Sequence, residues 1–271
     1  MEGVFRKLWQ ASPGSVTKSL IRKWHRLTAR PQWKKVLQGP LAGAELFFLG
    51  EYEEIAKEMT SGTHDNFFYT DPILKRVLSR SLCWDVGAHF GYHSLAFASL
   101  GARVVAFEPN AENAARLKLN LQRNPLLANK IRLRHEALSD HDGIVNFFQS
   151  NDLSGPSSGS HLAHATKPLE SSVYRNFQPV RITARQADSL IADGEEAPQI
   201  IKVDVEGAEL LMLQGARELL KSQKPVLLIE VHHINLMFHI RPFLENFRYT
   251  LRLAEGVGVD DCPSRCFMIA S

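Results

Sequence analysis

The stretch from Ser81 to Leu95 constrains the fold more than any other part of the sequence. Leu82 to Val86 is a short apolar, aromatic and β-branched run, which predicts a strand buried in a parallel sheet. Gly87 and Gly91 bracket the turn that follows, and Tyr92 to Leu100 has the apolar spacing of a helix. A strand that turns through glycine into a helix N-terminus leaves backbone N–H groups open, so this unit predicts a site for a nucleotide-like ligand.

A second predicted strand, Ala102 to Phe107, ends at a carboxylate. Glu108 lies 23 positions beyond Asp85, which fits the acid that binds ribose hydroxyls in doubly wound nucleotide folds. A dinucleotide fingerprint would have a third glycine, whereas here Ala88 and His89 fill the positions that a pyrophosphate would approach. The pattern therefore favours S-adenosylmethionine, with Asp85 near its ammonium group and Glu108 on its ribose. The alternative is that Asp85 and the glycines only shape a tight connection.

Charge is distributed unevenly along the chain. The 271 residues carry a net charge of +3, too small to indicate a polyanionic partner, yet residues 1–35 hold nine Lys or Arg against Glu2 alone. With its spaced tryptophans, this segment suits an anionic membrane surface or a phosphate-bearing substrate, or else is a solvated helical extension packed on the core. Three cysteines and no long apolar run predict a cytoplasmic protein without a disulfide framework or membrane span.

The sequence divides into two predicted parts. Residues 1–78 are expected to form a basic N-terminal helical extension or cap, and residues 79–271 the ligand-binding domain. Within the domain, residues 149–178 are rich in Ser, Gly and His and separate two strand patterns. Such an insertion is either a disordered loop or a functional lid, and its position favours a lid.

Acidic residues also follow the next predicted strand, Ile131 to His135. Glu136, Ala137 and Leu138 stand at its carboxyl end, where a fold of this plan would meet an adenine. Glu136 or Asp140 could accept a hydrogen bond from the adenine amine, or either could simply be a turn acid.

A second informative stretch runs from Gln199 to Leu213. Because side chains alternate along a strand, Lys202, Asp204 and Glu206 share one face as the strand ends. The strand after it ends in the same way, with Glu230 and His232 on one face. Parallel sheets bind ligands beyond their carboxyl ends, so these groups are candidates for catalysis. The alternative is an internal Lys202–Asp204 ion pair, with Glu206 as a helix cap.

These blocks, together with Ala106 to Asn110 and Ala137 to Ser139, resemble in order and spacing the FkbM-type S-adenosylmethionine-dependent methyltransferases over about residues 82 to 233. The resemblance implies an α/β class I methyltransferase (Rossmann-like) fold, with a seven-stranded, mostly parallel sheet and helices on both faces. It also implies O-methylation of a hydroxyl on a sugar, glycolipid or glycosylated natural product. Where the family often has Asn, this chain has His89. The predicted cofactor-binding residues are Asp85, Gly87, Ala88, His89, Gly91, Tyr92, Glu108, Pro109, Asn110, Glu136, Ala137 and Leu138.

Methyl transfer to a hydroxyl requires alignment of the oxygen behind the methyl carbon and removal of its proton. We predict Asp204 as base or substrate anchor, His232 as the second choice and Glu230 as an orienting group, with Lys202 in the same catalytic set. Asp204, Glu206 and Glu230 could instead hold a divalent metal, which we do not favour.

Two other activities compete with this interpretation. A nicotinamide-dependent oxidoreductase would need the missing third glycine. A nucleic-acid methyltransferase could use the basic N-terminus, but the sequence has no Asn-Pro-Pro-Tyr-type motif and no basic-aromatic platform. We therefore expect a hydroxyl-bearing small molecule, glycan or glycolipid as substrate.

Overall fold

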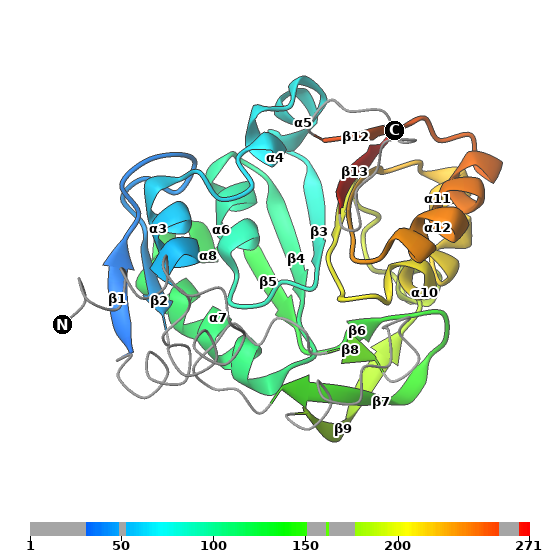
Figure 1. The fold of residues 1–271 in the computed structure, drawn as a ribbon, viewed down its shortest axis with the longest axis horizontal. Coiled ribbons are helices and arrows are strands. Elements are labelled where there is room, and N and C mark those ends of the chain that lie inside the picture. The colour runs from blue at the N-terminus through cyan, green and yellow to red at the C-terminus, as the bar shows by residue number, and fades with distance from the viewer. Residues whose placement is uncertain (1–30, 49–52, 151–160, 163–176, 255–265) are drawn as a thin grey trace, which may run out of the picture.

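The fold is built around a seven-stranded sheet. The structure is a computed structural model that describes residues 31–48, 53–150, 161–162, 177–254 and 266–271. The sheet has the order β12-β13-β11-β10-β3-β4-β5, and its core strands are parallel while β13 runs antiparallel to both neighbours. The predicted seven-stranded, mostly parallel sheet is confirmed (Figure 1). Its strands are β3 (Leu82–Val86), β4 (Arg103–Phe107), β5 (Ile131–Arg134), β10 (Ile200–Val203), β11 (Val226–Val231), β12 (Leu251–Leu253) and β13 (Cys266–Ala270).

Strand β3 shows how the sheet acquires helices on both faces. All five of its residues are buried, and because successive side chains alternate, Trp84 enters one apolar layer and Cys83 the other. The Trp84 layer packs on α9 (Ala187–Ala192), α10 (Glu209–Gln214), α11 (Arg217–Ser222) and α12 (Ile234–Asn246). The Cys83 layer packs on α6 (Tyr92–Ser99) and α7 (Ala111–Arg123). A short helix, α8 (Pro125–Ala128), precedes β5.

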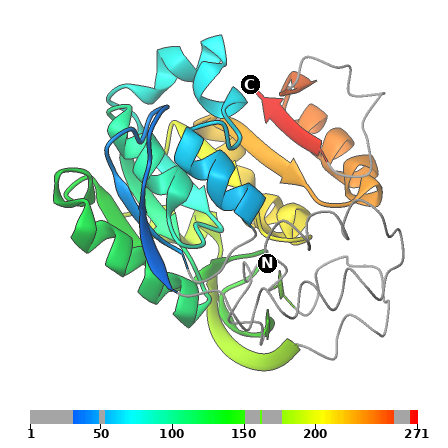
Figure 2. The ribbon, with the colours of Figure 1, turned by 60° about the vertical axis from the view of Figure 1, so that its left-hand side comes forward.

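The sequence predicted a helical extension before the sheet, but the described residues of this part also include two strands. Its described residues form an antiparallel hairpin, β1 (Gln32–Lys35) and β2 (Glu45–Phe48), and then α3 (Glu53–Ser61), α4 (Phe67–Thr70) and α5 (Pro72–Leu78). The hairpin lies along α7 (Figure 2). Asn120 of α7 accepts a hydrogen bond from the backbone N–H of Phe47 (2.8 Å), and Asn124, the residue after α7, accepts one from the N–H of Glu45 (3.1 Å). The hairpin therefore packs into the same core as the sheet. Residues 1–30 of the predicted extension lie outside the described residues.

A second sheet follows β5. It has the order β6-β9-β7-β8 and consists of β6 (Ala137–Leu138), β7 (Gly143–Ser150), β8 (His161–Leu162) and β9 (Phe177–Arg185). The predicted lid at 149–178 lies mostly outside the described residues, and its described parts are strand. Across the described chain, no helix combines the length and the apolar character that a bilayer crossing requires.

Candidate active site

The glycine turn after β3 sits against the end of β10. The N–H of Gly87 donates to the carbonyl of Phe107 (3.0 Å), and Gly87 adopts φ +81°. A Cβ at this position would lie 1.8 Å from the carbonyl oxygen of Asp204. Glycine is therefore required both by the left-handed backbone and by the close approach of the neighbouring strand end. Gly91, with φ +90°, then starts α6.

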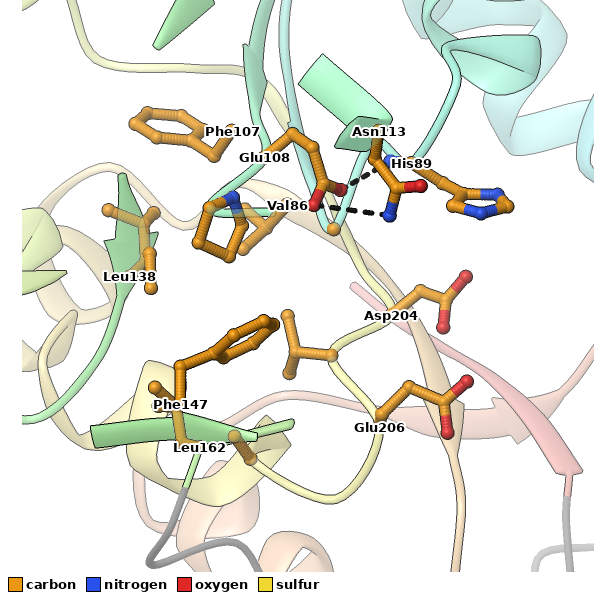
Figure 3. Close-up of a pocket in the computed structure, with 15 residues that line it drawn as sticks. Val86, His89, Phe107, Glu108, Asn113, Leu138, Phe147, Leu162, Asp204 and Glu206 are labelled. Atoms are coloured by element: carbon orange, nitrogen blue, oxygen red, sulfur yellow. Dashed lines mark hydrogen bonds between the residues drawn. The ribbon is translucent and has the colours of Figure 1, made fainter. Parts of the chain in front are cut away.

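A cavity opens beside this turn, at the carboxyl ends of β3, β4 and β10 (Figure 3). It brings Glu108 and Asp204 to one space, as the sequence predicted. Among the predicted residues, the cavity is lined by Gly87, His89, Glu108, Pro109, Ala137, Leu138 and Asp204. Glu206, which the sequence offered as a catalytic candidate, a metal ligand or a helix cap, also lines the cavity. The lining residues that were not predicted are Val86, Phe107, Asn113, Phe147, Leu162, Val205 and Ala208.

Glu108 is held by backbone donors from two directions. Its Oε2 accepts the N–H of His89 at 2.6 Å, and its Oε1 accepts the N–H of Asn110 at 2.9 Å. The side-chain amide of Asn113 lies 3.4 Å from the same Oε1. Burial raises the pKa of Glu108 to about 7 even though these hydrogen bonds favour the ionised form. Each oxygen has two lone pairs, so the carboxyl group retains acceptor capacity toward the cavity.

His89 occupies the crowded position of the turn. Its backbone has φ +52°, a conformation in which Asn, Asp and His are enriched among residues other than glycine. Burial lowers the pKa of the His89 imidazole to about 4, so the ring is neutral at physiological pH. The ring points away from Glu108 in Figure 3, so only its backbone N–H contacts that acid.

Apolar side chains line one side of the cavity. Phe107, Leu138, Phe147 and Leu162 surround this part, on the opposite side from the carboxylates of Asp204 and Glu206 (Figure 3). Phe147 and Leu162 come from the second sheet and are 5 % and 4 % exposed. Leu162 reaches the cavity because β8 pairs with β7, in which Phe147 lies opposite Leu162.

Asp85 lies beneath the cavity and does not line it. Its side chain is fully buried, its Oδ2 accepts from Ser94 Oγ at 2.6 Å, and its Oδ1 lies 3.2 Å from Lys202 Nζ. Lys202 Nζ also lies 3.3 Å from Asp204 Oδ2. Burial alone would lower the pKa of Lys202, but Asp85 and Asp204 outweigh it and raise the pKa. The Lys202–Asp204 ion pair, which the sequence offered as the alternative to a catalytic role, is thus present, and Asp85 also contacts Lys202.

Asp204 itself lines the cavity at the end of this chain of charges. Burial would raise the pKa of Asp204, but Lys202 and His232 lower it below its ordinary value. Its side chain is 29 % exposed. Asp204 is therefore an ionised carboxylate that is open to the cavity on one side and fixed by a buried lysine on the other.

His232 faces several carboxylates at the end of β11. Its Nδ1 lies 2.7 Å from Glu209 Oε1, while its Nε2 is 3.6 Å from Asp204 Oδ1 and 3.6 Å from Glu230 Oε1. Burial would lower the pKa of His232, but the hydrogen bond with Glu209 and the charges of Glu206 and Asp204 raise it to about 9. Sequence analysis missed Glu209, although it follows Asp204 within the same block.

The other predicted contacts lie outside the cavity lining. Ala88, Gly91 and Tyr92 form the turn and the first residue of α6, and Asn110 caps α7 by accepting from the N–H groups of Glu112 and Asn113. Glu136 accepts a hydrogen bond from Arg134. An adenine contact by Glu136 stays a prediction.

A group of histidines and an acid borders the same end of the site. His64 Nε2 and His93 Nε2 lie 3.4 Å and 3.3 Å from Asp65 Oδ2. Burial and, to a smaller extent, the charge of Asp204 act to raise the pKa of Asp65, but the contacts with His93 and His64 keep it below its ordinary value. This group, which the sequence did not single out, stands on the segment between α3 and α4 and on the first turn of α6.

Comparison with known proteins agrees with this geometry. The family model described as the methyltransferase FkbM domain matches residues 85–251. Hexuronic acid methyltransferase AglP of Haloferax volcanii is 33 % identical over 161 residues, and 2-O-methyltransferase NoeI of Sinorhizobium fredii is 31 % identical over 152 residues. These alignments cover 59 % and 52 % of this chain, and the chain spans 59 % of the length of each relative.

A solved structure supports the fold. The crystal structure of methyltransferase FkbM from Methylobacillus flagellatus superposes with a TM-score of 0.54 at 20 % identity, covering 76 % of this chain and 47 % of that one.

Proposed function

Because the chain belongs to the FkbM methyltransferase family, we propose that it transfers a methyl group from S-adenosylmethionine to a hydroxyl oxygen of a sugar. One observation carries the proposal. Glu108 and Asp204 line the same cavity at the carboxyl edge of the sheet, one beside apolar walls and the other beside a cluster of charges. The match to a methyltransferase model disfavours the nicotinamide alternative, and a thermal-shift comparison of S-adenosylhomocysteine with NAD checks this.

The residues of the cavity fit this cofactor. Phe107, Leu138 and Phe147 offer an apolar slot of the kind that accepts an adenine, and the buried Glu108 carboxylate can accept hydrogen bonds from ribose hydroxyls. When bound, S-adenosylmethionine supplies an electrophilic methyl carbon on its sulfonium. Asp85, being fully buried and ion-paired, would influence the ammonium end through its charge and through the turn that it supports.

Asp204 is the residue to which we assign the acceptor hydroxyl. Its carboxylate would accept a hydrogen bond from the hydroxyl, orient the oxygen toward the methyl carbon, and receive the proton as the new C–O bond forms and the S–C bond breaks. Lys202 acts as a positioning residue because it is buried and holds Asp204 Oδ2. His232 is held by Glu209 at its Nδ1, and its Nε2 lies 3.6 Å from Asp204 Oδ1, so His232 fits a role in positioning Asp204 better than the role of a base.

The acceptor class follows from the names of the relatives and from the charge of the site. One relative is named for hexuronic acid and the other for a 2-O position. A hexuronic acid offers both hydroxyls and a carboxylate to a methyl donor. Because Asp204, Glu206 and Glu230 crowd the acceptor end, a carboxylate acceptor would be repelled, so we propose transfer to a hydroxyl.

The test uses methyl-labelled S-adenosylmethionine with neutral-hexose and hexuronic-acid glycans. We expect a labelled methyl ether that survives mild alkali. Label released by alkali would indicate a methyl ester and would overturn the hydroxyl assignment. Failure to label any glycan, in protein that binds S-adenosylhomocysteine, would remove sugars as the substrate class.

A further inference from the structure

The His232 imidazole is surrounded by carboxylates in an arrangement that its hydrogen bonds do not explain. Its Nε2 lies 3.6 Å from Asp204 Oδ1, 3.6 Å from Glu230 Oε1 and 3.7 Å from Glu206 Oε2. These separations exceed the 2.7–3.2 Å of an N–H···O hydrogen bond. The Nε2 atom is buried and has no hydrogen-bond partner within the described part of the chain, and the side chain is 7 % exposed. A buried polar atom in this state requires an explanation.

The ring is fixed from behind. Glu209 is fully buried, its Oε1 lies 2.7 Å from His232 Nδ1, and the same oxygen accepts the N–H of Gly207 at 3.0 Å. This contact sets the orientation of the imidazole and aims Nε2 at the carboxylates. A carboxylate behind a histidine is the arrangement that proteins use to orient a metal-binding imidazole.

The spacing of the donor atoms leaves room for an ion. One donor atom each from Asp204, Glu230 and His232 can be chosen so that all lie within 4.8 Å of one another. N and O donors bonded to one ion at about 2.15 Å lie about 3.0 Å apart at an octahedral angle and about 3.5 Å apart at a tetrahedral angle. The separations of 3.6 Å around His232 Nε2 are close to the larger value and exceed the smaller by about 0.6 Å, so an octahedral ion requires the side chains to move inward.

The donor types point the same way. Among the described residues, Asp204, Glu206, Glu209 and Glu230 each place a carboxylate oxygen within 3.7 Å of a ring nitrogen of His232. Carboxylate oxygens together with a neutral imidazole are a common donor set for divalent cations.

We propose that Asp204, Glu230 and His232 bind a divalent cation, and that the open side of this cation binds the acceptor hydroxyl. Two carboxylates and one imidazole suit Mn²⁺, with Mg²⁺ and Zn²⁺ as the neighbouring choices. The role of the cation rests on the proposed function, but its binding does not. With the cation bound, Asp204 would serve as a ligand, and Glu206, whose side chain is 22 % exposed, would replace it as the base. The hydroxyl proton would pass to Glu206 while the oxygen forms the new C–O bond and the S–C bond breaks, leaving S-adenosylhomocysteine.

The binding test uses the full chain after treatment with a chelator. Titration with Mn²⁺, followed by the loss of the free-ion electron paramagnetic resonance signal, should give one ion per chain. Glu230→Gln and His232→Ala should each weaken binding at least tenfold. His141→Ala is the matched control because His141 is an exposed histidine beside an aspartate, Asp140, and should leave binding unchanged.

The same titration separates this site from the other group of ligating residues. His64→Ala removes a member of the His64, Asp65 and His93 group. Loss of Mn²⁺ binding in His64→Ala but not in Glu230→Gln would overturn the proposal, as would binding weaker than millimolar for Mn²⁺, Mg²⁺ and Zn²⁺. Glu230→Gln is the second variant if His232→Ala does not fold.

Activity then tests the role of the ion. Chelator should lower methyl transfer at least tenfold while S-adenosylhomocysteine binding persists, and added Mn²⁺ should restore transfer. Full activity in chelator would overturn the role of the cation and leave the proposed function standing. Failure to bind S-adenosylhomocysteine at all would instead count against the proposed function.

Discussion

The two ends of the cavity differ in how they are built. The end that we propose for the cofactor, called the cofactor end below, has walls of Phe107, Leu138 and Phe147 around a single acid, Glu108, which is held by backbone N–H groups. The end that we propose for the acceptor, called the acceptor end, contains charged side chains in contact with one another, such as Lys202 and Asp204. The first end depends on shape and apolar area, and the second on electrostatics. Substitutions at the first should therefore change cofactor binding, and substitutions at the second should change the rate of transfer.

The largest expected effect is at the acceptor end. Asp204→Ala should lower the rate of methyl transfer by about 10² to 10⁴, the range for loss of a general base. Lys202 keeps its contact with Asp85, so the protein should fold. S-adenosylhomocysteine affinity, measured by calorimetry, should change by less than about threefold. Unchanged turnover would remove Asp204 from the mechanism.

Gly87 joins the two ends, and its replacement should damage both. A Cβ there would collide with the carbonyl of Asp204, so Gly87→Ala should lower the free energy of unfolding by about 3 kcal/mol or more. Gly194→Ala is the matched control, because Gly194 also has positive φ, at +95°, but has open space around it. Chemical denaturation measures both variants. Equal losses of unfolding free energy in the two variants would show that the positive φ alone causes the destabilisation. That result would contradict a steric role for the close approach of the Asp204 carbonyl.

The cofactor end is tested by Glu108→Gln. An uncharged amide keeps the size of the side chain but loses two charge-assisted acceptors, so S-adenosylhomocysteine should bind about tenfold to a hundredfold more weakly. The rate of transfer at saturating cofactor should stay within about threefold of the unmodified protein. A fall in that rate without a change in affinity would place Glu108 in the wrong half of the cavity.

The pKa of Glu108 gives a smaller effect that depends on pH. In the proposed site, ribose hydroxyls would donate to the ionised carboxylate of Glu108. Because burial raises the pKa of Glu108 to about 7, cofactor binding should tighten up to about tenfold from pH 6 to pH 8. Glu108→Gln should remove this component of the pH dependence. Calorimetry across the range measures it, and affinity that falls as pH rises would have the wrong sign.

The same shift acts on the stability of the cofactor-free protein. The folded-state pKa of Glu108 lies above its ordinary value of 4.5, so folding favours the protonated form of this side chain. The resulting contribution to the free energy of unfolding is complete below pH 4.5 and is lost as the pH rises through about 7.

Local patterns predicted the part of the site that lies at strand ends. Gly87, Glu108 and Asp204 each follow a short apolar run, and parallel strands bring such ends to one edge. The walls supplied by Phe147 and Leu162 could not be predicted because they depend on pairing within the second sheet, between β7 and β8.

The hairpin escaped prediction for a similar reason. Its strands have four residues each and are held by Asn120 and Asn124, more than 70 positions away in the sequence. Burial also changed the expected roles of two charged residues. Asp85 and Lys202 were predicted to contact ligands, but the structure places them below the cavity as partners of each other.

The most direct test of the central claim is a crystal structure of the protein with S-adenosylhomocysteine. The account predicts the ribose hydroxyls on Glu108, the adenine against Leu138 and Phe147, and the sulfur directed toward Asp204. A ligand bound elsewhere, or bound in this cavity with its sulfur directed away from Asp204, would contradict it.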